Sequence, residues 1–197
     1  MMQNGVKWSE NVIVADADYV DKVAFDLIVN FERMLGRRVP QADLARWCEC
    51  IALDGGLRQG EHETHVVLIH HHQKKQLQNF VPAHYEQELN GQAFSGALGE
   101  FELSAITGEG LATTGEVLTD TLRLIGQQKE VKRLMVIPSE EQYSRVRETL
   151  RQIDDGEKHI TVFTMQPMAG GSFRQEILGY SLMAALGIKG EEINNQL

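Results

Sequence analysis

The stretch Asn11-Val-Ile-Val-Ala-Asp-Ala-Asp-Tyr19 decides the fold. Residues 12–15 form a short, uncharged run rich in β-branched side chains, which is typical of a strand buried on both faces. The run stops at Asp16 and Asp18, and apolar residues then recur at helical spacing from Tyr19 onward. Ligands of open parallel sheets bind just past the carboxyl ends of the strands. This turn is therefore a candidate ligand or metal site.

The rest of the chain alternates between apolar runs and helical patterns in the same way. Further strands are predicted at residues 65–69, 101–106, 134–137 and 160–164, and helices at residues 19–35, 40–54, 73–91, 116–125, 139–153 and 172–188. This alternation indicates a parallel sheet with helices on both faces. We therefore predict the α/β class, with a doubly wound, mainly parallel five-stranded sheet and residues 12–15 in its middle.

Length and composition are those of one ordinary globular domain spanning residues 1–197, of which residues 1–10 are a polar lead-in. No apolar run approaches the roughly 18 residues of a membrane span, so no membrane contact is expected. A net charge of −9 argues against a non-specific nucleic-acid coat but leaves room for a nuclease with a local basic groove. The side chains of Cys48 and Cys50 diverge on a predicted helix, which favours a reducing cytoplasm.

The first acidic candidates are Asp16 and Asp18. From one turn, both carboxylates could reach one cation, and Mg²⁺ or Mn²⁺ commonly takes one or two carboxylates while keeping several waters. The structural alternative is that these residues cap the first helix or form an Asx turn.

Further acidic candidates follow the strand predicted at residues 134–137 and lie on the helix before it. Glu140 and Glu141 begin a helix, where negative side chains are favoured by the helix dipole alone. Asp120 shares one helix face with Glu116, for which a solvated acidic face is the alternative. If the strand at residues 134–137 lies beside the strand at residues 12–15, Glu140 borders the same crevice as Asp16. We therefore predict that Asp16, Asp18, Asp120, Glu140 and Glu141 converge on one acidic pocket.

Two other patterns are candidate binding sites. His70 and His72 point the same way if that segment is extended, so the histidine cluster at residues 70–72 could bind an ion, although a partly exposed, nonspecific cluster is the alternative. The Gly/Thr-rich turn at residues 107–115 precedes a helix, and helix N-termini bind phosphate. It has neither the P-loop Lys-Ser/Thr nor the Rossmann spacing, so a mobile loop is the alternative to a nucleotide or phosphosugar site there.

Three segments carry a family resemblance: Val12-Ile-Val-Ala-Asp16, Gly115-Glu-Val-Leu-Thr-Asp120 and Leu134-Met-Val-Ile-Pro-Ser-Glu-Glu-Gln-Tyr143. Together, over roughly residues 11–165, the chain resembles the NYN and PIN-like family of Rossmann-like domains, which includes metal-dependent ribonucleases. The resemblance implies a sheet order of 3-2-1-4-5, with a crevice between the first and fourth strands. The third segment departs from the family, because Glu140 and Gln142 stand where the family has two Asp.

Two hypotheses of function follow. The first is a Mg²⁺- or Mn²⁺-dependent nuclease or phosphohydrolase, in which Asp16, Asp120 and Glu140 are catalytic and Asp18 and Glu141 help to hold the ion, which activates water. The resemblance brings RNA in as a partner, which the net charge does not favour. The second is a non-enzymatic binding or assembly module. The helix predicted at residues 172–188 is apolar nearly all round, so it is either deeply docked or shared in a homodimer.

Overall fold

A computed structural model describes residues 7–108, 110–170 and 173–195. Its strands are β1 (Asn11–Asp16), β2 (Ala42–Asp43), β3 (His62–Ile69), β4 (Phe80–Val81), β5 (Ala93–Gly96), β6 (Gly99–Ile106), β7 (Arg133–Ile137), β8 (His159–Thr164) and β9 (Arg174–Ile177). Its helices are α1 (Ala17–Leu35), α2 (Leu44–Asp54), η1 (Tyr85–Leu89), α3 (Thr114–Gly126), η2 (Glu140–Gln142), α4 (Tyr143–Ile153), α5 (Leu178–Ala185) and α6 (Gly190–Asn194). The predicted α/β class is confirmed.

The main sheet has seven strands in the order β5-β6-β3-β1-β7-β8-β9. Only β5 pairs antiparallel with its neighbour; the other pairs are parallel. β1 lies in the middle, between β3 and β7, and all six of its residues are buried. The prediction of five strands is wrong, because β5 and β9 extend the sheet at its two edges. Both have only four residues: β5 is Ala-Phe-Ser-Gly and mostly exposed, and β9 is the largely polar Arg-Gln-Glu-Ile. Neither sequence has the apolar run of a buried strand.

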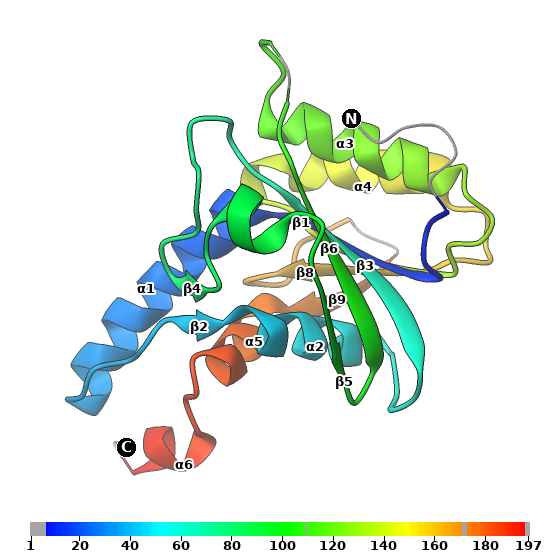
Figure 1. Ribbon diagram of the computed structural model, residues 1–197. Helices are drawn as coiled ribbons and strands as arrows, with labels where there is room; N and C mark the ends of the chain where they lie inside the picture. The colour runs from blue at the N-terminus through cyan, green and yellow to red at the C-terminus, as the bar shows by residue number, and fades with distance from the viewer. Residues whose placement is uncertain (1–6, 109, 171–172, 196–197) are drawn as a thin grey trace.

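Two helical layers cover the sheet, with α1, α2 and α5 on one face and α3 and α4 on the other (Figure 1). Ile13 and Ala15 pack with α1, α2 and α5, whereas Val12 and Val14 pack with α3 and α4. Successive side chains of a strand point to opposite faces, so an uninterrupted apolar strand needs cover on both faces. The sheet is therefore doubly wound, as predicted.

The helix predicted at residues 172–188 is wrong in its first part. Residues 174–177 form the edge strand β9, and the helix α5 begins only at Leu178; residues 171–172 lie outside the described part of the chain. Leu178 and Leu182 are fully buried in the same apolar cluster as α2. The apolar character of this helix is thus explained by docking within the chain. This helix therefore no longer gives a reason to expect a homodimer, and the homodimer stays a prediction.

The helix predicted at residues 73–91 is also largely wrong. The segment contains a turn and the two-residue strand β4, which pairs with β2, and only Tyr85–Leu89 is helical, as a π-helix. It is fastened to α1 by Asp21, whose carboxylate accepts hydrogen bonds from the backbone N–H groups of Gln78 and Asn79. The side chains of its own Phe80 and Tyr85 are buried in the core. Tertiary anchoring, rather than helical propensity, decides this segment.

No helix among the described residues combines the length and the apolar character needed to cross a membrane.

Candidate functional site

The carboxyl ends of β1 and β7 meet at the point where the strand order reverses. From β1 the chain moves outward through β3 to β6, and then returns to the other side of β1 to continue through β7, β8 and β9. In open α/β sheets this topological switch point is where ligands bind. The residues that follow β1, β7 and β8 are therefore the first candidates for function.

Asp16 ends β1 at this point and is 5% exposed. It is the N-cap of α1, and its Oδ1 accepts a hydrogen bond of 3.1 Å from the backbone N–H of Tyr19. Burial, with a smaller contribution from the neighbouring charge of Asp18, raises the pKa of Asp16 to about 6, even though the hydrogen bond from Tyr19 acts to lower it. Asp16 thus caps the first helix, which is the structural role that the sequence offered as the alternative to a metal ligand. Its pKa of about 6 nevertheless lies well above that of an ordinary carboxyl group. A group of this kind is suited to proton exchange.

A groove of about 310 Å³ opens beside α1 at the switch point. It is lined by Tyr19, Lys22, Val23, Asp26, Leu27, Asn30, Glu140 and Met165. Six of these belong to α1, whereas Glu140 begins η2 after β7 and Met165 follows β8. We call this feature the switch-point groove. Its volume is at the lower end of the range of ligand pockets.

Tyr19 connects the groove to the buried carboxyl of Asp16. Burial, together with the negative charges of Glu140 and Asp16, raises the pKa of the Tyr19 phenol to about 12. The phenol therefore remains protonated at neutral pH and can donate a hydrogen bond. The negative charges of two predicted site residues, Asp16 and Glu140, thus both raise the pKa of one side chain of the groove, Tyr19.

The other side of Asp16 faces the end of β3. Asp18 accepts a hydrogen bond of 2.7 Å from the backbone N–H of His71. His70 is buried, stacks on Tyr85 with 3.7 Å between ring centroids, and places its Nδ1 3.0 Å from the carbonyl oxygen of His71. Burial lowers the pKa of His70. With Nδ1–H donating to that carbonyl, the neutral ring carries its lone pair on the buried Nε2.

The histidine cluster does not form a metal site. His70 is buried against Tyr85, whereas His71 and His72 are exposed and stack on each other. His65 is buried elsewhere, with its Nε2 2.8 Å from the Ser104 hydroxyl. The segment leaves the sheet at His70 and turns, so the alternation of an extended strand no longer holds.

The predicted convergence of five carboxylates is wrong. Asp120 is 77% exposed and pairs with Arg123 at 3.1 Å on α3, which covers the opposite face of the sheet from α1. Glu141 is exposed and does not line the groove. Among residues 7–108, 110–170 and 173–195, no group of three or more His, Cys, Asp or Glu side chains is arranged to hold a metal ion. Asp16, Asp18 and Glu140 remain at the carboxyl ends of the strands.

The polar turn before α3 has a structural explanation in its described part. Thr113 caps the helix by accepting a hydrogen bond from the backbone N–H of Glu116, and the Glu116 carboxylate accepts one from the backbone N–H of Thr113. This capping box satisfies the first N–H groups of α3. The glycine and threonine pattern is therefore explained, in its described part, by the capping of the N-terminus of α3.

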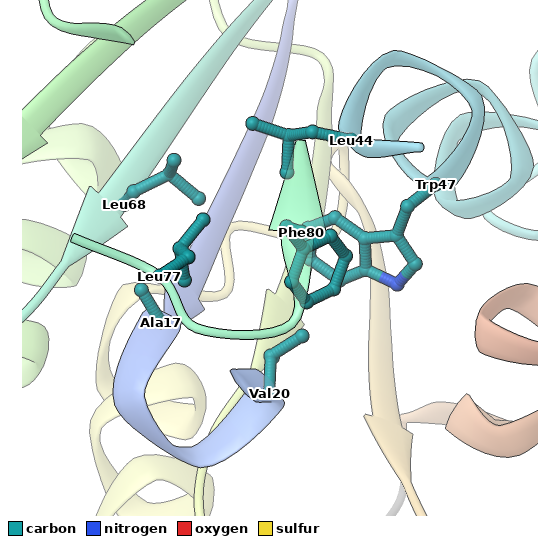
Figure 2. A pocket seen from close by; sticks show the side chains of 7 residues that line it. All are labelled: Ala17, Val20, Leu44, Trp47, Leu68, Leu77 and Phe80. Atoms are coloured by element: carbon teal, nitrogen blue, oxygen red, sulfur yellow. The ribbon is translucent and has the colours of Figure 1, made fainter. Parts of the chain in front are cut away.

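A second cavity lies within the core between α1, α2 and β4 (Figure 2). Its lining is apolar: Ala17, Val20, Leu44, Trp47, Leu68, Leu77 and Phe80. Figure 2 shows the Phe80 ring close to the Trp47 indole, and their ring centroids are 5.9 Å apart. The void measures only about 10 Å³, close to the lower limit for one water molecule, so it is a packing defect of the core.

Sequence reasoning missed the polar side of α1. Lys22, Asp26 and Asn30 recur at intervals of four residues beside the apolar stripe of that helix. That spacing was available as a signal of one continuous face. What the spacing could not reveal is that Glu140 and Met165, from distant parts of the chain, close the other side.

A family model described as a family of unknown function, DUF6621, matches residues 5–193. No curated protein and no solved structure matches the chain. The matched range includes β1, the whole switch-point groove and α5.

Proposed function

The chain belongs to DUF6621, a family of unknown function, and we propose that it binds a small polar molecule in the switch-point groove. The observation that carries the proposal is the position of the groove, which lies at the carboxyl ends of β1, β7 and β8 and is lined from three separate parts of the chain. Ligands of doubly wound sheets bind at this place. Apolar side chains beside a few polar groups are typical of such sites.

A thermal-shift screen with a matched pair of variants tests this proposal. The probes are amino acids, amines, sugars, organic acids and nucleotides. Met165→Trp narrows the groove, whereas Met34→Trp adds the same bulk at a 45% exposed position of α1 outside the groove. We expect at least one class to raise the melting temperature of the wild type and of Met34→Trp, but not of Met165→Trp. If no class raises it, or if Met165→Trp responds like the wild type, the groove is not the binding site.

A second candidate function is a Mg²⁺- or Mn²⁺-dependent nuclease or phosphohydrolase. The observation in its favour is that Asp16 ends β1 and Glu140 follows the neighbouring strand β7, so that two carboxylates stand at one crevice, and Mg²⁺ often takes only one or two carboxylates directly. Lys22 on the groove would then face the phosphate. RNA as the substrate and Asp18 as a further ligand belong to this candidate.

Metal titration of two neighbouring glutamine variants separates the two candidates. Glu140 lines the groove and Glu141, one residue on, does not. The metal-dependent candidate predicts that millimolar Mg²⁺ or Mn²⁺ raises the melting temperature of the wild type and of Glu141→Gln, but not of Glu140→Gln. Equal responses of all three proteins would contradict it.

A further inference from the structure

The polar side chains of the switch-point groove alternate in charge along α1. At the Tyr19 end, Glu140 contributes a carboxylate; Lys22 follows one turn along the helix, and Asp26 one turn further. All three charged residues are exposed, whereas Val23 is buried and Leu27 half-buried. The groove therefore has an apolar floor beneath a rim charged negative, positive and negative.

These charges have no ion-pair partner among the described residues. Across residues 7–108, 110–170 and 173–195, the ion pairs join Arg37 to Glu192, Arg123 to Asp120, Arg151 to Glu148, Lys158 to Asp155 and Arg174 to Glu176. None of them includes Lys22, Asp26 or Glu140. Each of these three groups is therefore available to a ligand of opposite charge.

We propose that the ligand is a basic α-amino acid, a molecule with an ammonium group and a carboxylate on its α-carbon and a second ammonium group at the end of its side chain; this inference rests on the proposed function. Its α-ammonium faces Glu140, its carboxylate faces Lys22 and its terminal ammonium faces Asp26. The methylene chain lies on Val23, Leu27 and Met165.

The spacing of the charges fits such a molecule. Four residues of helix separate Lys22 from Asp26 by about 6 Å along the axis. An extended aliphatic chain of roughly five bonds of about 1.5 Å spans a similar distance. The Tyr19 ring lies beside Glu140 in the lining, where its face can also receive an ammonium group. An acidic amino acid would place its second carboxylate against Asp26 and be rejected.

Calorimetric titration with four probes tests the ligand class. Lysine has all three charged groups, norleucine lacks the terminal ammonium, cadaverine lacks the carboxylate, and glutamate has the opposite terminal charge. We expect the wild type to bind lysine about fivefold or more tightly than norleucine or cadaverine, as expected of a partly solvated ion pair. Glutamate is expected not to bind.

Two variants then assign each charge. Lys22→Met should lower the affinity for lysine to that for cadaverine, and Asp26→Asn should lower it to that for norleucine. Lys132→Met and Asp120→Asn, exposed positions outside the groove, are the matched controls and should change nothing. The inference would be overturned if norleucine or cadaverine bound as tightly as lysine. It would also be overturned if Lys22→Met or Asp26→Asn still bound lysine as much more tightly than cadaverine and norleucine as the wild type does.

The ligand class and the proposed function fail in different ways. If nucleotides, sugars or organic acids give shifts that Met165→Trp abolishes while lysine gives none, the groove binds small molecules but the ligand is not a basic amino acid. If no probe of any class depends on the groove, both proposals fall together.

Discussion

At the scale of the residue, the central feature is a carboxyl group with a conflict between two roles. Asp16 caps α1, which favours its ionised form, but it is buried at the end of the middle strand, which favours the neutral form. The effect of burial is the larger of the two, since the pKa of Asp16 rises from 3.8 to about 6. The native state then keeps a proton that the unfolded chain releases between these pH values. Stability contributed by this group therefore falls as the pH rises from about 4 to 6.

Asp16→Asn should consequently stabilise the protein at pH 7. Asparagine retains a capping oxygen but carries no charge. A shift of about two pKa units corresponds to roughly 3 kcal/mol, and we expect a gain of roughly 1–3 kcal/mol in the free energy of unfolding at pH 7 that nearly vanishes at pH 4. Urea unfolding at both pH values measures it. A loss of stability at pH 7 would show that the ionised cap outweighs the cost of burial.

At the scale of the element, Lys158 ties the turn between α3 and β7 to the start of β8. Its side chain is 2% exposed, and its Nζ donates hydrogen bonds to the carbonyl oxygens of Gln128 and Val131 at 2.9 and 3.0 Å. Lys158→Met removes both donors from buried carbonyl groups, each worth about 1–3 kcal/mol. We expect a loss of roughly 2–4 kcal/mol in the free energy of unfolding, against almost none for the exposed Lys132→Met. Similar midpoints in guanidinium for the two variants would refute this role.

The elements also show which parts of the fold can be predicted from the sequence and which cannot. The buried strands β1 and β7 were predictable because four consecutive apolar residues need cover on both faces. Strand β9 was not, because Arg174-Gln-Glu-Ile177 has no strand pattern and only its place beside β8 makes it extended. For the site, the sequence indicated Asp16 and Glu140. The rest of the groove depends on helix rotation and on Met165 arriving after β8, which no local pattern encodes.

At the scale of the whole molecule, the buried histidines and the buried aspartate change the free energy of unfolding in opposite directions as the pH changes. Burial lowers the pKa values of His65 and His70 below 6.5, so the unfolded chain takes up protons that the native state refuses. Their contribution to stability is complete above about pH 6.5 and is lost as the pH falls through that value. Between pH 6.5 and 5, Asp16 contributes in the opposite direction.

The double variant His65→Gln, His70→Gln separates these opposing contributions. We expect its free energy of unfolding to rise, or to fall less steeply than that of the wild type, as the pH is lowered from 6.5 to 5. The slope is the readout, so any uniform loss of stability from the substitutions does not affect it. Identical slopes in the two proteins would mean that the buried imidazoles are not the proton acceptors.

Location of the bound ligand by nuclear magnetic resonance tests the switch-point groove most directly. Free lysine is titrated into the ¹⁵N-labelled protein, and the backbone amide shifts are followed along the chain. We predict saturable shifts confined to residues 19–30 of α1, Glu140 and Met165, with none at β5 or α6. Saturable shifts centred on His70 and Tyr85 instead, or the absence of any saturable shift with lysine and with every other probe class, would contradict a ligand site at the switch point.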